Sequence, residues 1–197
     1  MSASLVVVRY NAGNVRSVAH ALERLGATFR ISDDASEIMA AERVIFPGVG
    51  EAGSAMRYLR ERNLDRVLKE VQKPFLSICL GLQLMAEESE ENNTLCLGII
   101  PGSVNRFTVP RKVPHMGWSA VSHSGHALFE GIPQDSYFYF VHSYRLGVMP
   151  YTIGRCRYEE DFSAAVAYKN FVGVQFHPEK SADAGERLLS NFLKWSV

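Results

Sequence analysis

The stretch Lys73-Pro74-Phe75-Leu76-Ser77-Ile78-Cys79-Leu80-Gly81-Leu82-Gln83-Leu84 decides how this chain folds and where its chemistry is placed. Residues 74–78 have the length and the β-branched content of a buried strand. A helical pattern begins directly after Cys79, and the small residues Ser77 and Gly81 lie two positions to either side. The sequence therefore predicts a sharp strand-to-helix junction that lifts the Cys79 thiol out of the sheet as a nucleophile.

A cysteine nucleophile reacts as its thiolate and needs a base nearby. The apolar run 171–176 reads as another buried strand, and it ends at His177-Pro178-Glu179. The separation from the cysteine, 177 − 79 = 98 residues, is natural for two strand ends that meet at one edge of a sheet. We expect His177 to take or hold the thiol proton and Glu179 to orient the imidazole. Cys79, His177 and Glu179 thus form a candidate acyl-transfer triad.

The order of the apolar runs indicates the fold class. In the first half, expected strands at 5–8, 29–31, 44–46 and 74–78 alternate with expected helices at 15–25, 34–39, 55–62, 64–71 and 80–86. This alternation predicts a parallel sheet with helices on both faces. Strand-like runs dominate the second half, at 97–100, 118–121, 137–141, 153–158, 164–168 and 171–176, before a closing helix with Leu188, Leu189, Phe192 and Leu193 on one face. We predict one domain, 1–197, of three-layer α/β architecture, whose central mixed, mostly parallel sheet is flanked by helices and has antiparallel additions in the second half.

Composition excludes several classes of protein. Lys plus Arg and Asp plus Glu are 21 each, and a net charge of zero argues against a nucleic-acid partner. No apolar run approaches the roughly 20 residues of a membrane-spanning helix, and the start of the chain lacks the pattern of a signal peptide. Three scattered cysteines form no disulfide framework, so a reducing cytoplasm fits best. The histidines at 115, 123 and 126 have no acidic or cysteine ligand at suitable spacing, so we expect neither a metal nor a cofactor.

Three motifs, in this order, resemble those of the class I (triad-type) glutamine amidotransferases: Phe46-Pro47-Gly48-Val49-Gly50, Cys79-Leu80-Gly81-Leu82-Gln83 and His177-Pro178-Glu179. The resemblance covers nearly the whole chain. It implies a flavodoxin-like fold and the hydrolysis of glutamine to glutamate and ammonia through a cysteine thioester. Finer motifs resemble the glutaminase subunit of imidazole glycerol phosphate synthase: Tyr10-Asn11-Ala12-Gly13-Asn14, Pro114-His115-Met116-Gly117-Trp118, Phe140-Val141-His142-Ser143-Tyr144, and Lys180.

The loop Gly48-Val49-Gly50 reads either as a simple tight turn or as part of an oxyanion hole. Its place after a strand, in a chain that contains a nucleophile elbow, favours the second interpretation. We expect the hole to consist of the Val49 N–H and the N–H of Leu80, the residue after the nucleophile.

Substrate contacts follow partly from spacing and partly from the resemblance. Gln83 lies about one helical turn beyond Cys79, and the resemblance implies that it contacts the substrate. The segment after the aromatic strand would hold the α-amino and α-carboxylate groups of glutamine, largely through backbone groups. His142 is also a rival base, ranked below His177 because no acidic residue stands near it in sequence. The expected substrate-binding set is Gly48, Gln83, His142, Ser143 and Tyr144.

The resemblance implies a partner, a (β/α)8-barrel cyclase subunit that uses the ammonia to make imidazole glycerol phosphate and aminoimidazole carboxamide ribotide in histidine biosynthesis. A tryptophan is by default a core residue, so the exposure of Trp118 distinguishes an interface residue from a buried one. Three positions depart from the family pattern: Arg9, Ser77 and Ser119 stand where an acidic residue, a glycine and an asparagine are usual. The residues expected at the interface are Asn11, Asn14, Trp118 and Lys180.

Two alternatives stay open. The chain could be a glutaminase subunit of another synthase, such as one for pyridoxal phosphate, although the Trp118 segment and Tyr144 argue against it. It could also be a catalytically inactive, amidotransferase-like binding subunit, although an intact Cys79, His177 and Glu179 argue against that.

Overall fold

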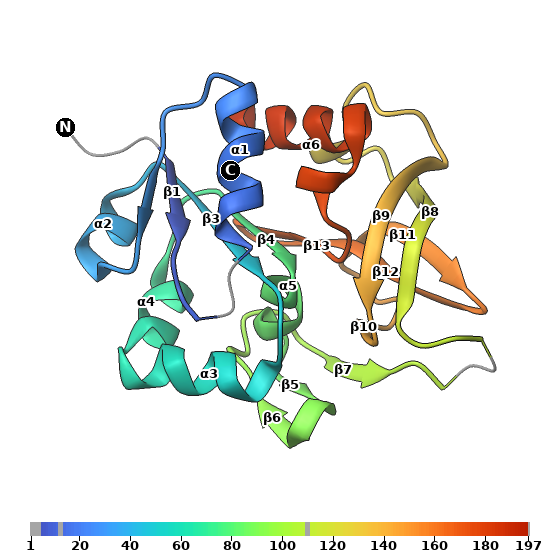
Figure 1. Cartoon of the computed structure of the whole chain (residues 1–197), viewed down its shortest axis with the longest axis horizontal. Coiled ribbons are helices and arrows are strands. Elements are labelled where there is room, and N and C mark those ends of the chain that lie inside the picture. Colours follow the sequence, from blue (N-terminus) through green and yellow to red (C-terminus); the bar gives the residue numbers. More distant parts are fainter. Residues whose placement is uncertain (1–4, 12–13, 109–110, 197) are drawn as a thin grey trace.

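A mixed nine-stranded sheet forms the centre of the computed structural model, which describes residues 5–11, 14–108 and 111–196 (Figure 1). The strand order is β2-β1-β3-β4-β13-β12-β11-β8-β9. Neighbours pair in parallel from β2 to β13 and antiparallel from β13 to β9. The expected mixed sheet is confirmed, but its parallel and antiparallel pairings are equal in number, four of each, so it is not mostly parallel. The strands are β1 (Leu5–Val8), β2 (Arg30–Ser32), β3 (Arg43–Gly48), β4 (Phe75–Cys79), β8 (His115–His123), β9 (Ser136–His142), β11 (Thr152–Tyr158), β12 (Glu160–Tyr168) and β13 (Phe171–Val174).

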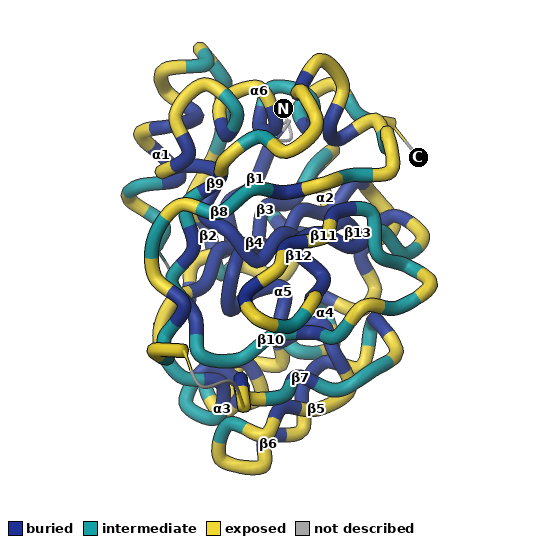
Figure 2. Tube along the Cα trace, turned by 90° about the vertical axis from the view of Figure 1, so that its right-hand side faces the viewer, coloured by how far each residue is buried: buried dark blue, intermediate teal, exposed yellow. Residues whose placement is uncertain are grey.

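Helices cover both faces of this sheet (Figure 1). One face packs against α1 (Val15–Arg24) and α6 (Ala182–Lys194). The other packs against α2 (Ala35–Ala40), α3 (Ala52–Glu61), α4 (Leu64–Glu70) and α5 (Leu80–Met85). Successive strand residues point to opposite faces. Strands such as β1 are therefore apolar throughout, as parallel strands covered on both sides must be, and Figure 2 shows this buried centre in dark blue.

A second, small sheet was not expected from the sequence. Its order is β10-β7-β5-β6, and each of these strands has two to four residues, too few to show a period-two pattern. Three single-turn 3₁₀ helices complete the described part of the chain. The additional elements are β5 (Glu88–Ser89), β6 (Thr94–Leu95), β7 (Ser103–Arg106), β10 (Tyr144–Leu146), η1 (Glu91–Asn93), η2 (Ala127–Phe129) and η3 (Pro178–Lys180).

The strand expected at 97–100 is wrong. The Leu97 N–H donates to the carbonyl of Leu84 (2.8 Å), and the N–H groups of Ile99 and Ile100 both donate to the carbonyl of Met85 (2.9 Å). The last carbonyls of a helix have no partner within the helix. This run therefore caps the end of α5 and buries Leu97 and Ile100, instead of joining a sheet.

Only half of a capping box forms at the start of α2. The Asp34 carboxylate accepts a hydrogen bond from the Glu37 N–H (3.0 Å). The Glu37 carboxylate pairs with Arg30 (2.9 Å), while the Asp34 N–H donates to the Ser32 hydroxyl (3.0 Å). Residues 169–170 form the turn between β12 and β13, which pair antiparallel.

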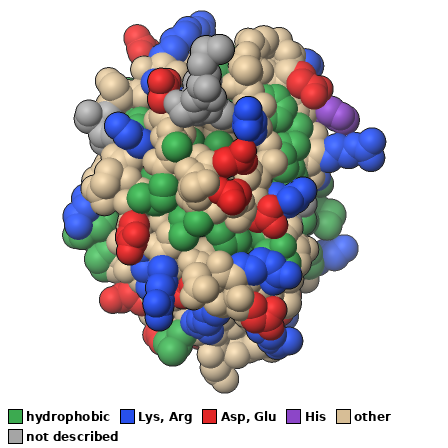
Figure 3. Space-filling model, turned by 90° about the vertical axis from the view of Figure 1, so that its left-hand side faces the viewer, with side chains coloured by type: hydrophobic (Ala, Val, Ile, Leu, Met, Phe, Trp, Pro, Cys, Tyr) green, Lys and Arg blue, Asp and Glu red, His purple; other side chains and the backbone are tan. Residues whose placement is uncertain are grey.

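On the face drawn in Figure 3, Lys and Arg side chains are mixed with Asp and Glu side chains, so neither sign of charge dominates this surface. This mixture agrees with the net charge of zero. None of the helices in the described ranges is long and apolar enough to cross a membrane.

Gly81, in the first turn of α5, allows this helix to lie against β3. A Cβ at this position would overlap the backbone carbonyl of Phe46, which cannot move without shifting β3. We expect Gly81→Ala to lower the free energy of unfolding by about 1–3 kcal/mol, although alanine favours helix. Denaturant unfolding measures this. Gly147→Ala is the control, because nothing lies within 4 Å of its added Cβ. Equal stabilities of the two variants would contradict the packing argument.

Candidate active site

Cys79 occupies the strained junction that the sequence predicts. It is the last residue of β4 and directly precedes α5, with φ 53° and ψ −110°. Non-glycine residues rarely adopt positive φ, at a cost of about 1–3 kcal/mol, and such strain persists only where the surroundings enforce it. Here β4 is held between β3 and β13, and Gly48 pairs directly with Cys79. The backbone therefore fixes the position of the sulfur at the carboxyl end of the sheet.

His177 and Glu179 lie within hydrogen-bond distance of each other. Nδ1 of His177 is 2.8 Å from Oε1 of Glu179, which also accepts a bond from the Asn14 amide (2.6 Å). An ionised carboxylate only accepts, so Nδ1 carries a hydrogen. Nε2 is buried and has no nitrogen or oxygen partner among the described residues. It is the ring atom left for the thiol.

The surroundings of His177 favour its charged form. Burial by itself would lower the pKa of this imidazole, but hydrogen bonds to Cys79 and Glu179 outweigh it and raise the pKa to about 10. The protonated imidazole is therefore favoured at this position, where it could stabilise a thiolate.

His142, the rival base, is fully engaged elsewhere. Its Nδ1 lies 2.8 Å from the Tyr144 carbonyl, to which it must donate, and its Nε2 lies 3.1 Å from Nδ1 of His115. Nε2 of His115 in turn lies 2.8 Å from the hydroxyl of Ser119, one of the positions that depart from the family pattern. Burial lowers the pKa of His142 to about 3 and that of His115 to about 4, so both rings stay neutral. Such an environment suits a positioning role better than that of a base.

A cavity of about 280 Å³ opens at the carboxyl ends of the strands, above the Cys79 sulfur. It brings together most of the residues expected at the nucleophile, the oxyanion hole and the substrate contacts. Gly48 does not line it and lies beneath it, paired with Cys79 in the sheet. The lining residues are Val49, Gly50, Cys79, Leu80, Gln83, Glu91, Pro114, Val141, His142, Ser143, Tyr144 and His177.

Glu91 is a cavity residue that the sequence reasoning missed. It belongs to η1, and one of its oxygens accepts the Ala52 N–H (2.7 Å). Burial raises the pKa of this carboxyl. Among the described lining residues it is the one acidic side chain. No sequence signal marked it, because the segment that carries it is a single irregular turn.

Gln175 is a second residue that the sequence reasoning missed. It is fully buried, and its Nε2 lies 3.7 Å from the Cys79 sulfur. Its Oε1 accepts a hydrogen bond from Nε2 of Gln83 (3.0 Å). A signal existed, since Gln175 is the one polar side chain in the otherwise apolar run 171–176.

The residues expected at a partner interface lie around this site. Asn14 contacts the carboxylate of Glu179, as described above, and the exposed Asn11 donates to the Ser54 carbonyl (3.3 Å). Trp118 is 51% exposed, and Lys180 is exposed. Residues 12 and 13 of the same motif lie outside the described residues. Arg9, another departure from the family pattern, pairs with Asp33 at the surface.

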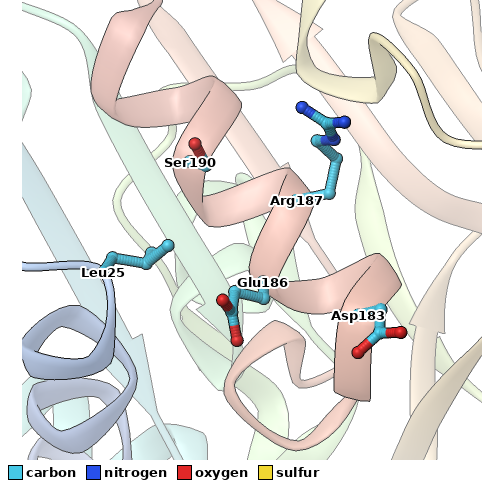
Figure 4. Close-up of a pocket in the computed structure, with 5 residues that line it drawn as sticks. All are labelled: Leu25, Asp183, Glu186, Arg187 and Ser190. Atoms are coloured by element: carbon cyan, nitrogen blue, oxygen red, sulfur yellow. The ribbon is translucent and has the colours of Figure 1, made fainter.

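A separate depression of about 260 Å³ lies along α6 and shares no lining residue with the candidate active site (Figure 4). Its lining carries acidic, basic and hydroxyl groups without a cysteine or histidine, and we assign no function to it. Within the described ranges, no three His, Cys, Asp or Glu side chains gather as a metal site. The residues of the depression are Leu25, Asp183, Glu186, Arg187 and Ser190.

Comparison with known families decides the kind of site. A family model described as glutamine amidotransferase class-I matches residues 6–195. The chain belongs to the class I glutamine amidotransferases. It is 50% identical over 194 residues to the imidazole glycerol phosphate synthase subunit HisH of Bacteroides fragilis (strain YCH46), covering 96% of this chain and 98% of the relative. It is 46% identical over 202 residues to the HisH subunit of Vibrio cholerae serotype O1, covering 98% and 100%. The resemblance inferred from the motifs is confirmed.

Solved structures support the same fold. A crystal structure of a glutamine amidotransferase superposes with a TM-score of 0.75 at 20% identity, covering 96% of this amidotransferase chain and 97% of the other. A PurLQS structure from Thermotoga maritima gives 0.71 at 18% identity, covering 98% and 99%. At such identities the likeness concerns the fold alone, and it confirms the expected fold class.

The strain at Cys79 predicts that a glycine variant at this position is at least as stable as an alanine variant. At ordinary positions glycine is about 0.5–1 kcal/mol less stable than alanine. At a φ of 53° the alanine keeps its Cβ in an unfavourable conformation, and glycine does not. We expect Cys79→Gly to unfold at the same denaturant concentration as Cys79→Ala or a higher one. A Cys79→Gly variant clearly less stable than Cys79→Ala would contradict the assignment of strain.

Proposed function

We propose that this chain is the glutaminase subunit of an imidazole glycerol phosphate synthase, which hydrolyses L-glutamine and supplies ammonia for histidine biosynthesis. The observation that carries the chemistry is the hydrogen bond that holds Nδ1 of His177 on Glu179 and leaves the buried Nε2 for the Cys79 sulfur. Identity of 46–50% over nearly the full length of synthase subunits supports the biosynthetic role.

The first half of the reaction forms a thioester. The Cys79 thiolate attacks the side-chain amide carbon of glutamine, and a carbon–sulfur bond forms as the carbonyl electrons move to oxygen. The tetrahedral intermediate collapses, the carbon–nitrogen bond breaks, and Nε2 of His177 gives its proton to the leaving nitrogen, which departs as ammonia.

The second half releases glutamate. His177, now neutral at Nε2, takes a proton from water as the oxygen attacks the thioester carbon. The carbon–sulfur bond then breaks, and the thiolate and the imidazolium are restored. Glu179 keeps the ring in one orientation throughout, because its carboxylate accepts from Nδ1.

Backbone N–H groups stabilise the oxyanion in both halves of the reaction. Leu80 is the first residue of α5, so its N–H has no partner within the helix. Val49 lines the same cavity from the loop after β3. Donors of this kind typically contribute about 2.7–4 kcal/mol each to the transition state. Side-chain changes at Val49 should therefore matter less than changes that rotate its peptide group.

The polar groups of the substrate find complementary partners along the cavity. The Glu91 carboxylate suits the α-ammonium group of glutamine. Ser143 and Tyr144 offer backbone groups to the α-amino and α-carboxylate ends, and Gln83 offers its Oε1, since both its N–H groups are engaged. His142 contributes through its backbone, because its ring is turned into the core.

An exposed apolar patch beside the active site suits a partner subunit. Met116, Trp118 and Tyr137 on β8 and β9 are 63%, 51% and 61% exposed. They share one face, because Trp118 pairs with Tyr139 across the two strands. The Tyr139 carbonyl accepts the His177 N–H (2.9 Å), so the patch continues into the catalytic segment. We infer that a (β/α)8-barrel cyclase docks here, with Lys180, Asn11 and Asn14 nearby, and receives the ammonia through a shielded passage.

Two further expectations complete the proposal. The chain, residues 1–197, acts as one glutaminase domain, since the family match runs almost from end to end. It works in the cytoplasm, where its three free cysteines stay reduced.

The decisive assay measures glutamate release from glutamine by the chain alone and with a candidate cyclase subunit and its nucleotide ligand, each with and without Cys79→Ala. We expect activity that rises with the partner and falls at least ~10³-fold in the variant. If the partner does not change the activity, the chain is still a glutaminase, but its assignment to histidine biosynthesis is wrong. A folded, partner-bound chain without activity would favour a non-catalytic binding subunit.

The proposed interface makes a separate prediction. We expect Trp118→Ala to weaken association with the cyclase subunit by about 2 kcal/mol, because exposed tryptophans commonly anchor interfaces. Leu95→Ala is the matched control, since Leu95 is 65% exposed on β6 of the other sheet. Isothermal titration calorimetry measures both affinities. Equal affinities of the two variants would remove Trp118 from the interface.

A further inference from the structure

The buried amide of Gln175 faces the sulfur of the candidate nucleophile. We propose that Gln175 is a catalytic residue, which donates an N–H hydrogen bond to the Cys79 sulfur and favours the thiolate, and that Gln83 fixes the direction of this amide. The inference rests on the proposed function and extends it, because Gln175 adds a sulfur-directed donor to the triad.

The direction of the Gln175 amide follows from its neighbours. The Gln83 side chain contacts the Tyr144 carbonyl at 2.9 Å, and a carbonyl can only accept, so the contacting atom is the Gln83 nitrogen. The same nitrogen lies 3.0 Å from Gln175 and therefore donates to it, which identifies the facing atom of Gln175 as oxygen. The nitrogen end of Gln175 then points at the sulfur, at 3.7 Å.

This arrangement distinguishes the two protonation states of the sulfur. A neutral thiol has an acceptor in the Val141 carbonyl, 3.9 Å away. A thiolate cannot donate and takes hydrogen bonds from Gln175 and His177. Hydrogen bonds to an ionised acceptor are roughly twice as strong as neutral ones. The Gln175 amide therefore stabilises the thiolate more than the neutral thiol.

The other ionisable groups around the sulfur do not replace this donor. His177 provides the positive charge, with Glu179 behind it. His142 is neutral and donates to Tyr144. The Tyr10 hydroxyl is buried without a partner among the described residues, and the Glu91 carboxylate lines the cavity. Among the described side chains, Gln175 and His177 are the two with an N–H directed at the sulfur.

Gln175 can be changed without disturbing its backbone. Its N–H donates to the Ala164 carbonyl (2.8 Å) whatever the side chain is. Methionine has a similar length, removes the donor and tolerates an apolar environment. Gln175→Met therefore tests the side chain, and Gln72→Met, at an exposed glutamine, is the matched control.

The test measures the rate of Cys79 alkylation by iodoacetamide against pH in the full chain without glutamine. Peptide mass spectrometry separates Cys79 from Cys96 and Cys156. We expect Gln175→Met to move the midpoint up by about one pH unit, so that it reacts about tenfold more slowly below both midpoints and reaches the same plateau at high pH. Gln72→Met should match the wild type. An unchanged midpoint in folded Gln175→Met would overturn the proposal.

A measurement on the unmodified chain decides the question if Gln175→Met does not fold. The side-chain amide resonances of Gln175 should move with pH at the midpoint of Cys79 alkylation, and this movement should disappear in Cys79→Ser. If the Gln175 amide resonances do not shift when Cys79 ionises, the proposal is wrong. Neither measurement needs glutamine hydrolysis, so a failed glutaminase assay and a failed Gln175 test are separate results.

Discussion

The positive φ of Cys79 is the constraint on which the rest of the site depends. A strand that ends in this conformation must turn at once into α5, and the turn brings the sulfur, the Leu80 N–H and Gln83 to one cavity. The conformation is enforced by β3 and β13 on either side of β4 and by the absence of a side chain at Gly81. The stable central sheet thus holds the Cys79 sulfur in a fixed position.

Carbonyl and carboxylate acceptors set the direction of the hydrogen bonds that His177, His142 and Gln83 make around that atom. Glu179 fixes the hydrogen on Nδ1 of His177, and the Tyr144 carbonyl fixes both His142 and Gln83. The pKa values of two histidines from different segments consequently move in opposite directions, up for His177 beside the sulfur and down for His142 in the core. Burial alone would make both neutral, so the neighbours decide the chemistry.

The sequence predicts the features that depend on long apolar runs and on the order of the motifs along the chain. The parallel strands, the elbow at Cys79 and the meeting of Cys79 with His177 follow from apolar runs whose ends share one sheet edge. The four short strands, the capping run 97–100 and the position of Glu91 depend on tertiary hydrogen bonds that leave no periodicity. Gln175 was missed for another reason, since a lone polar residue in a strand reads as a minor irregularity until its partners are known.

A thiol-reactive glutamine analogue tests the central claim, that the fold makes Cys79 a glutamine-directed nucleophile. Burial raises the pKa of Cys96 and Cys156 to about 12 each, so both should stay unreactive at neutral pH. Peptide mass spectrometry after brief exposure should find the label on Cys79 alone, and added glutamine should slow the labelling. Labelling that avoids Cys79, or that is indifferent to glutamine, would contradict the account.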